Sequence, residues 1–182
     1  MWKTVYTLTL TALSGAMLSG CIGENKSDFT VCEGIYALCT TAQCQAIAGQ
    51  EDTVSCDCTV KTGYSLGLEP CKGEVATAEG KQIVSRYYPI KSYASCSNDR
   101  PWANCLDSPC IVDDSDSSKA DCACQVVKDQ GPYVIVTETY DASTCTSGIW
   151  SSATVTDVSE ATDFLKTNDK LKPFDVKVLN PE

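Results

Sequence analysis

Twelve cysteines in this chain fall into two sets of six with matching spacing. The first set is Cys32, Cys39, Cys44, Cys56, Cys58 and Cys71, and the second is Cys96, Cys105, Cys110, Cys122, Cys124 and Cys145. The three middle intervals, of 5, 12 and 2 residues, are the same in both sets, and only the outer intervals differ. Three equal intervals in succession predict an internal duplication, with two related halves rather than an array of repeats.

The size of each half explains why it needs cysteines. A segment of roughly 65 to 85 residues gains only a few kcal/mol from one apolar core, and a disulfide that closes a loop of about 15 residues adds roughly 3 kcal/mol. We therefore expect six disulfides, three in each half, with the same pairing in both. A bond within a Cys-x-Cys element would close a strained ring, but the sequence leaves the remaining pairings open.

The first twenty residues have the composition of an export signal. Lys3 precedes an apolar stretch from Thr4 to Met17, and Leu18-Ser19-Gly20-Cys21 follows this stretch. A membrane-spanning helix needs about 20 apolar residues, whereas this stretch is shorter and contains threonines. Leu18-Ser19-Gly20-Cys21 resembles the lipobox of bacterial lipoproteins. The resemblance implies that residues 1–20 are removed and that Cys21 carries fatty acyl chains such as palmitate, which anchor the protein to a membrane.

The cysteine count favours the same interpretation. The chain has 13 cysteines, an odd number, and assigning Cys21 to the lipid leaves an even set. Disulfides persist in oxidising compartments such as the periplasm and the cell surface. In the Gram-negative lipoproteins that this segment resembles, an aspartate directly after the lipidated cysteine looks like a signal for retention in the inner membrane. Ile22 stands there instead, which implies the outer membrane. The alternative is an ordinary secretory signal, with Cys21 as a structural cysteine.

These observations predict a β-rich, disulfide-stapled fold of two related Cys-rich halves with a C-terminal helix and strand. After the signal, residues 21–31 form a lipid-anchored tether. The first half spans residues 32–90, and the second half, with the helix, spans 91–182.

Charge and the lack of one residue type exclude several functions. The chain has 24 acidic and 14 basic residues, which argues against nucleic acid and against electrostatic attachment to anionic lipid. It has no histidine. This excludes Ser-His-Asp and Cys-His catalysis and c-type haem attachment, and it removes the usual ligands of catalytic zinc. Paired carboxylates remain available for catalysis. We predict no cofactor and no metal.

Local patterns predict the secondary structure. Helical turns are expected in 35–44 and 102–106, and a hairpin in 125–139 with its turn at 129–131. Each Cys-x-Cys element is expected to begin a strand, with both sulfurs on one face. A strand broken by Pro89 is expected in 83–93. A helix is expected over 157–168, with a capping-box-like start at Asp157 and Glu160, followed by a strand in 174–178.

Four features are candidate sites. The Cys-x-Cys elements fit redox or metal chemistry, but structural disulfides are the simpler interpretation. The acidic segment 113–118 resembles the start of a calcium loop, but Lys119 and Gln125 occupy the places where an EF-hand needs glycine and glutamate. The alternative is a solvated loop.

The C-terminal helix is expected to pack on the second half rather than to dock a partner. Six aromatic residues are predicted to form either a platform that binds a glycan or peptide or part of the core: Tyr87, Tyr88, Tyr93, Trp102, Tyr133 and Trp150.

The sequence favours a membrane-anchored structural or binding lipoprotein of the bacterial cell envelope, with a protein or glycan partner and without catalysis. An inhibitor of a protease or lysozyme is the first alternative. A carboxylate-dependent hydrolase is the second, and a cleft with two carboxylates would favour it.

Overall fold

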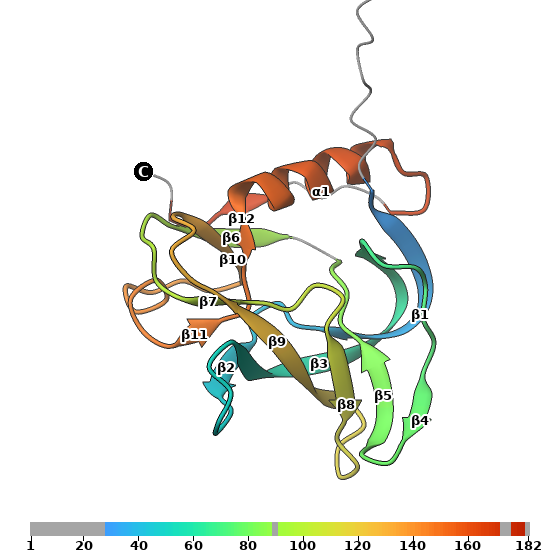
Figure 1. Ribbon diagram of the computed structural model, residues 1–182. Helices are drawn as coiled ribbons and strands as arrows, with labels where there is room; N and C mark the ends of the chain where they lie inside the picture. Colours follow the sequence, from blue (N-terminus) through green and yellow to red (C-terminus); the bar gives the residue numbers. More distant parts are fainter. Residues whose placement is uncertain (1–27, 89–90, 172–175, 181–182) are drawn as a thin grey trace, which may run out of the picture.

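The chain folds into two β-sheets and one helix, seen in the computed structural model (Figure 1). The structure describes residues 28–88, 91–171 and 176–180. The strands are β1 (Thr30–Leu38), β2 (Gln43–Ala46), β3 (Thr53–Gly67), β4 (Val75–Thr77), β5 (Gly80–Val84), β6 (Ser92–Cys96), β7 (Trp102–Asn104), β8 (Pro109–Val112), β9 (Lys119–Val127), β10 (Tyr133–Val136), β11 (Ile149–Trp150), β12 (Ala153–Thr154) and β13 (Lys177–Val178). The helix α1 is Val155–Thr167. The predicted β-rich, disulfide-stapled fold with a C-terminal helix and strand is confirmed.

The larger sheet has nine strands. Seven of them follow the order β11-β2-β3-β9-β8-β5-β4, while β1 pairs with β3 and β7 pairs with β9. The smaller sheet has the order β12-β10-β6-β13, and β13 runs parallel to β6. Helix α1 lies across the end of the molecule that holds the smaller sheet (Figure 1). No helix among the described residues is long and apolar enough to cross a membrane.

The Cys-x-Cys elements lie at the centre of the larger sheet, on β3 and β9. In β3 the buried residues Val54, Cys56 and Cys58 alternate with more exposed ones, and β9 alternates in the same way. Because successive side chains on a strand point to opposite faces, both sulfurs of each element share one face, as predicted, and this face is the buried one. The elements lie inside the strands rather than at their starts, since β3 begins at Thr53 and β9 at Lys119.

Both halves contain three nested disulfides. In each set the first cysteine pairs with the sixth, the second with the fifth and the third with the fourth. The bridges are Cys32–Cys71, Cys39–Cys58 and Cys44–Cys56 in the first half, and Cys96–Cys145, Cys105–Cys124 and Cys110–Cys122 in the second. The predicted six disulfides with one shared pairing scheme are confirmed.

Strand register relates the halves by a constant offset of 66 residues, from Cys56 to Cys122. These two residues lie directly opposite each other where β3 pairs with β9. The same offset relates the pair Leu38 and Thr59 to the pair Asn104 and Gln125. Thr53 faces Gln125, the counterpart of Thr59, and Thr59 faces Lys119, the counterpart of Thr53, as at the interface of a two-fold symmetric dimer. Duplication of one ancestral half is a hypothesis that accounts for this register.

The halves exchange edge strands. Ile83 of β5 lies opposite Cys110 of the second half, and Ile149 of β11 lies opposite Cys44 of the first. The bridges from Ala37 to Ser85 and from Ala103 to Ser151 keep the 66-residue offset. Both halves therefore share one sheet.

Cysteines make up about half of the buried core of the larger sheet. Of the fifteen buried residues in this cluster, eight are the cysteines of the four inner disulfides. The other members are small or aliphatic: Ala37, Ala42, Val54, Ile83, Ala103, Val112 and Ala120. Smaller clusters surround Leu66, Leu165 and Leu171, and Trp102, Tyr133 and Ile135.

Helix α1 buries the predicted residues but begins earlier than predicted. Val158, Ala161 and Leu165 are buried. The N-cap is Thr154, whose hydroxyl accepts from the Asp157 N–H (3.0 Å), while the Asp157 carboxylate accepts from the Thr154 N–H (3.2 Å). Asp157 is thus the N3 residue of the capping box, three positions after the N-cap, because Thr154 supplies the hydroxyl that the N-cap position favours.

The two predicted helical turns are wrong. Residues 30–38 and 43–46 are strands, and so are residues 102–104. Strand β1 pairs along its whole length with β3, and β7 pairs with β9. These long-range ladders satisfy the backbone, and they override the weak local preference for a helical turn.

The predicted hairpin at 125–139 is also wrong, and its turn is a crossover between sheets. Strand β9 ends at Val127, whereas β10 pairs with β6 and β12 of the smaller sheet. Asp129 and Gly131 both have positive φ angles (55° and 75°) where the chain leaves one sheet for the other. The stretch 83–93 similarly contains the end of β5 and the start of β6, in different sheets.

Candidate functional site

A polar cleft lies where the larger sheet meets the smaller one. The Thr41 N–H donates to the Val136 carbonyl (2.9 Å), which joins the turn after β1 to the end of β10. The cleft has a volume of about 670 Å³. Its lining comes from five separate parts of the chain: Leu38, Thr40, Thr41, Thr59, Lys61, Lys91, Ser92, Val136, Thr137, Glu138, Thr139, Asp141, Ser143, Thr144 and Trp150. Ligand sites in proteins have volumes of about 300 to 1,000 Å³.

Hydroxyl groups dominate the lining of the cleft, and several are held by the backbone. The Ser92 hydroxyl donates to the Thr137 carbonyl, and the Thr137 hydroxyl donates to the Thr139 carbonyl (2.9 Å). The Thr139 N–H donates back to the Thr137 hydroxyl (3.2 Å). A hydroxyl is both donor and acceptor, so fixed hydroxyls present a defined hydrogen-bonding pattern.

Thr41 has a backbone conformation that is unusual for its residue type. Its φ angle is 65°, in the left-handed region, where a β-branched side chain is strained. Its counterpart in the other half, Asp107, also has a positive φ (57°), and aspartate tolerates this region better. Strain of this kind collects at functional positions when the surrounding structure enforces it. Because the equivalent turn of the other half has the same conformation, the positive φ of Thr41 belongs to the turn that the halves share, and in the first half this turn lines the cleft.

Two lysines and two carboxylates face the same cleft: Lys61, Lys91, Glu138 and Asp141. The Asp141 carboxylate accepts hydrogen bonds from the Ser143 hydroxyl and from the Ser143 N–H (2.6 Å). These hydrogen bonds, led by the one from the hydroxyl, hold the pKa of Asp141 below its usual value. A carboxylate with a lowered pKa stays ionised at neutral pH and is a poor proton donor, so Asp141 lacks the property a general acid needs.

Trp150 is the aromatic residue in the lining of the cleft. Its side chain is half-buried, and its indole N–H donates to the Ser147 carbonyl (3.0 Å), which fixes the ring. The other aromatic residues of the predicted platform do not line the cleft. Trp102 and Tyr133 are buried and lie 6.2 Å apart in the core, while Tyr87 and Tyr93 pack on the cluster of Val134 and Val158. Tyr88 packs on the cluster of Leu66. These rings belong to the core, and Trp150 also packs on the cluster of Trp102 and Tyr133 while it lines the cleft.

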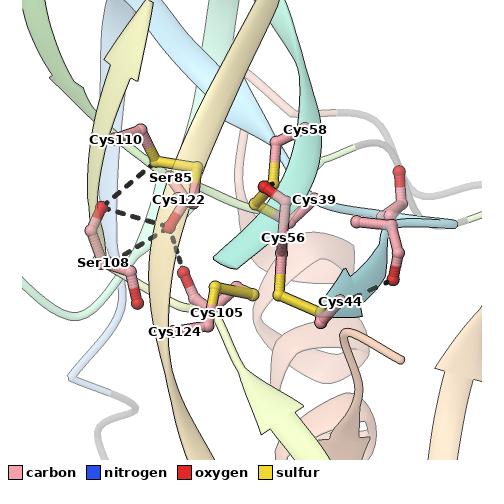
Figure 2. Close-up of a disulfide and its surroundings, with 12 residues drawn as sticks. Cys39, Cys44, Cys56, Cys58, Ser85, Cys105, Ser108, Cys110, Cys122 and Cys124 are labelled. Carbon is pink, nitrogen blue, oxygen red and sulfur yellow. Dashed lines mark hydrogen bonds between the residues drawn. A yellow bond between two sulfur atoms is a disulfide. The ribbon is translucent and has the colours of Figure 1, made fainter. Parts of the chain in front are cut away.

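The four inner disulfides form a buried block in the core of the larger sheet (Figure 2). Sulfurs of different bridges lie within 4.8 Å of one another, as in the group of Cys39, Cys105 and Cys124. Because these sulfurs are paired in disulfides, they are not the thiolates that bind soft metals. Ser85 joins the block through the Cys105 carbonyl, to which its hydroxyl donates, and through the Ser108 N–H, which donates to that hydroxyl (3.0 Å). The structural interpretation of the Cys-x-Cys elements is confirmed.

The acidic segment 113–118 is the end of the β8–β9 hairpin, which projects from the larger sheet (Figure 1). The Asp113 carboxylate accepts from the Ser115 hydroxyl and N–H, and the Asp116 carboxylate accepts in the same way from Ser118. These hydrogen bonds, the one from the hydroxyl first, lower the pKa of each aspartate. The carboxylates therefore shape the turn itself, and this accounts for their spacing.

Sequence reasoning missed a buried ion pair between Arg86 and Asp107. The two side chains are 2% and 8% exposed. The Asp107 carboxylate also accepts from the N–H groups of Leu68 (2.7 Å) and Glu69 (3.0 Å). Arg86 donates to three further groups: the Glu69 carbonyl, the Thr30 carbonyl and the Cys32 sulfur. Arg86 is one of few arginines in the chain, but nothing local in the sequence marks it as buried.

The lipidation site predicted at Cys21 lies outside the described residues. Comparison of the chain with protein-family models, with curated proteins and with solved structures returns no match.

Proposed function

We propose that the mature protein is a lipid-anchored binding protein of the bacterial cell envelope. In this proposal Cys21 carries the anchor in the outer membrane, and the polar cleft binds an envelope saccharide without transforming it. The cleft is the observation that carries the proposal. It combines fixed hydroxyls, charged groups of both signs and one aromatic ring, Trp150. Hydroxyls and charges match the polar rim of a sugar, and an aromatic face matches its apolar C–H face.

The disulfide block supports binding with a fixed geometry. Thr59 lies next to Cys58 on β3, so one wall of the cleft is attached to the Cys39–Cys58 bridge. A cleft whose walls are covalently held loses little conformational entropy when a ligand enters, which favours affinity. The hydrogen bonds from Ser143 favour the anionic form of Asp141, and an anionic carboxylate is a good acceptor for the hydroxyl groups of a saccharide.

Binding is tested with soluble fragments of peptidoglycan and of outer-membrane oligosaccharides. Trp150 and the buried Trp102 are the tryptophans of the mature chain, so a ligand in the cleft changes the fluorescence of Trp150. We expect Trp150→Ala and Lys91→Ala to weaken binding at least about tenfold, as loss of one good contact does. Lys81→Ala is the matched control, since Lys81 is an exposed lysine on β5 outside the cleft. Equal binding by all three variants, or cleavage of the saccharide, contradicts the proposal.

The anchor is tested separately. We expect the chain to incorporate a fatty-acid probe and Cys21→Ser to release it from membranes, because several acyl chains at about 0.8 kcal/mol per methylene give a stable anchor. Cys71→Ser is the control and should leave labelling unchanged. A chain that is membrane-bound without label contradicts this part of the proposal.

The projecting β8–β9 hairpin favours a second candidate function, inhibition of a protease or lysozyme. The Cys110–Cys122 bridge closes its base, and the hydrogen bonds of Asp113 and Asp116 order its end. Preordered loops of this type suit inhibitors because little entropy is lost on binding. Inhibition assays with serine proteases and lysozymes test this role, and Ser115→Ala together with Ser118→Ala should weaken any inhibition found.

A further inference from the structure

The Cys32–Cys71 bridge differs from the other five disulfides in its exposure. The eight cysteines of the inner bridges are between 0% and 7% exposed, and Cys96 and Cys145 are 1% and 9% exposed. Cys32, in contrast, is half-buried, and Cys71 is exposed in the irregular segment between β3 and β4. A pocket of about 110 Å³ lies beside this bridge and is lined by both of its cysteines. An external thiol therefore has access to the sulfur of Cys71.

The inner side of this bridge touches a cation. Nη2 of Arg86 lies 2.9 Å from the sulfur of Cys32 and 3.0 Å from the Thr30 carbonyl. Nη1 of the same guanidinium faces the Asp107 carboxylate, so Nη2 remains directed at the sulfur. Lys72, next to Cys71, is paired with Glu69 instead (3.8 Å). The two sulfurs thus differ: Cys71 is accessible, whereas Cys32 is placed to be stabilised as a thiolate.

We propose that Cys71 is a site of thiol–disulfide exchange, at which an external thiol opens the bridge with Cys32 as the leaving thiolate. The attacking thiolate forms a bond to the Cys71 sulfur, and the bond between Cys71 and Cys32 breaks. Its electron pair stays on Cys32 beside the Arg86 guanidinium. A second thiol of the same reductant can then attack the mixed disulfide, which yields the oxidised reductant and a free Cys71 thiol. Alternatively, the Cys32 thiolate attacks Cys71 and restores the bridge. Exchange is faster when the leaving thiolate is stabilised.

Opening this bridge changes the protein only locally. The bridge ties the segment after β3 to β1, with a sequence separation of 39 residues. When it opens, Asp107 still binds the N–H groups of Leu68 and Glu69, so the first part of this segment stays in place. The remaining five bridges are unchanged. The exchange therefore frees the stretch around Cys71 and Gly73 without unfolding the sheet.

The second half contains the matched control for the experiment. The full exported chain carrying Cys21→Ser is incubated with glutathione and its disulfide, then alkylated and analysed by peptide mass spectrometry. We expect Cys32–Cys71 to open about tenfold faster than its counterpart Cys96–Cys145, with the glutathione adduct on Cys71. Equal rates for the two bridges, or an adduct found equally on Cys32, overturn the proposal.

Two single variants separate the effect of Arg86 from that of exposure. Cys71→Ser leaves a free thiol at Cys32 beside Arg86, and Cys32→Ser leaves a free thiol at Cys71. We expect the ultraviolet absorbance of the thiolate to persist to lower pH in Cys71→Ser, and Cys32→Ser to keep a stable glutathione adduct. Near-ultraviolet circular dichroism verifies that both variants are folded. Loss of the thiolate signal at the same pH in both variants shows that Arg86 has no role and overturns the assignment of Cys32 as the leaving group.

Discussion

Gly67 shows how one residue without a side chain permits the buried ion pair. It ends β3 at the point where Arg86 and Asp107 meet. A Cβ atom added to Gly67 would overlap with Nη1 and Cζ of Arg86 and with the Asp107 carboxylate. These atoms are buried and belong to a network that also binds Leu68, Glu69 and Thr30. A shift of Arg86 or Asp107 to make room would separate the buried ion pair, and separating buried charges is costly.

We expect Gly67→Ala to lower the free energy of unfolding by about 2 to 3 kcal/mol, since overpacking of a filled site costs about this much. Gly73→Ala is the matched control. Its added Cβ meets nothing within 4 Å, so its stability should remain near that of the parent. Denaturant unfolding of the chain carrying Cys21→Ser measures both. Equal stability of the two variants would show that the pocket around Arg86 yields to a methyl group.

The sequence predicts little at the residue scale beyond the cysteines. The even number of cysteines after Cys21 and their repeated spacing predict which residues form disulfides, because cysteine is the residue type that forms these bonds. A buried arginine such as Arg86 and a half-buried tryptophan such as Trp150 carry no such mark. Their burial is decided by strands that are distant in the chain, and the hydroxyls of the cleft are typical of any exposed surface. The candidate cleft was therefore found only in the structure.

At the scale of the elements, the pairing of β3 with β9 sets two like charges opposite each other. Asp57 and Asp121 are cross-strand partners on the exposed face of the larger sheet. Partial burial, and then the facing Asp57 carboxylate, raises the pKa of Asp121 above its usual value. The folded chain therefore binds a proton at Asp121 more tightly than the unfolded chain does. Ionisation of Asp121 consequently lowers stability as the pH rises through the raised pKa.

We expect Asp121→Asn to raise the free energy of unfolding at pH 7 by about 0.5 kcal/mol, in the range of cross-strand charge pairs. The gain should vanish below about pH 3.5, where the carboxyl is protonated in both states. Asp113→Asn should have the opposite sign at neutral pH, because hydrogen bonds from Ser115 lower the pKa of Asp113 in the folded state. Unfolding curves across this pH range measure both. A loss of stability in Asp121→Asn would refute the repulsion.

Local patterns predicted some elements well and others badly. The Cys-x-Cys elements were predicted to lie on strands with both sulfurs on one face, and the spacing of Val158, Ala161 and Leu165 predicted the helix. The prediction of a hairpin at 125–139 was wrong because segments rich in valine and tyrosine on either side of a glycine turn indicate only two successive strands. The pattern does not show that β9 belongs to one sheet and β10 to the other. The exchange of β5 and β11 between the halves is a long-range pairing, which local composition does not encode.

At the scale of the whole molecule, the shared sheet makes the two halves depend on each other. Strand β5 lies on β8 of the other half, β11 lies on β2, and the sulfur-rich core includes residues of both. We expect residues 28–90 and 91–182, expressed separately in the periplasm, to lack native disulfides and dispersed amide spectra. Mixing them in a glutathione redox buffer should restore the fold, because the missing edge strands become available. A half that folds alone would contradict this dependence.

The sulfur-rich core also governs when and where the chain can fold. Eight of the fifteen buried residues in its cluster are cysteines, whose sulfurs are joined only by oxidation. A newly made chain in a reducing cytosol lacks these bonds and has few large aliphatic residues to replace them. If the chain is exported as proposed, we expect it to reach the secretion channel before these bonds form. Oxidation then acts as the signal for assembly, so the redox state of a compartment decides where this protein acquires its shape.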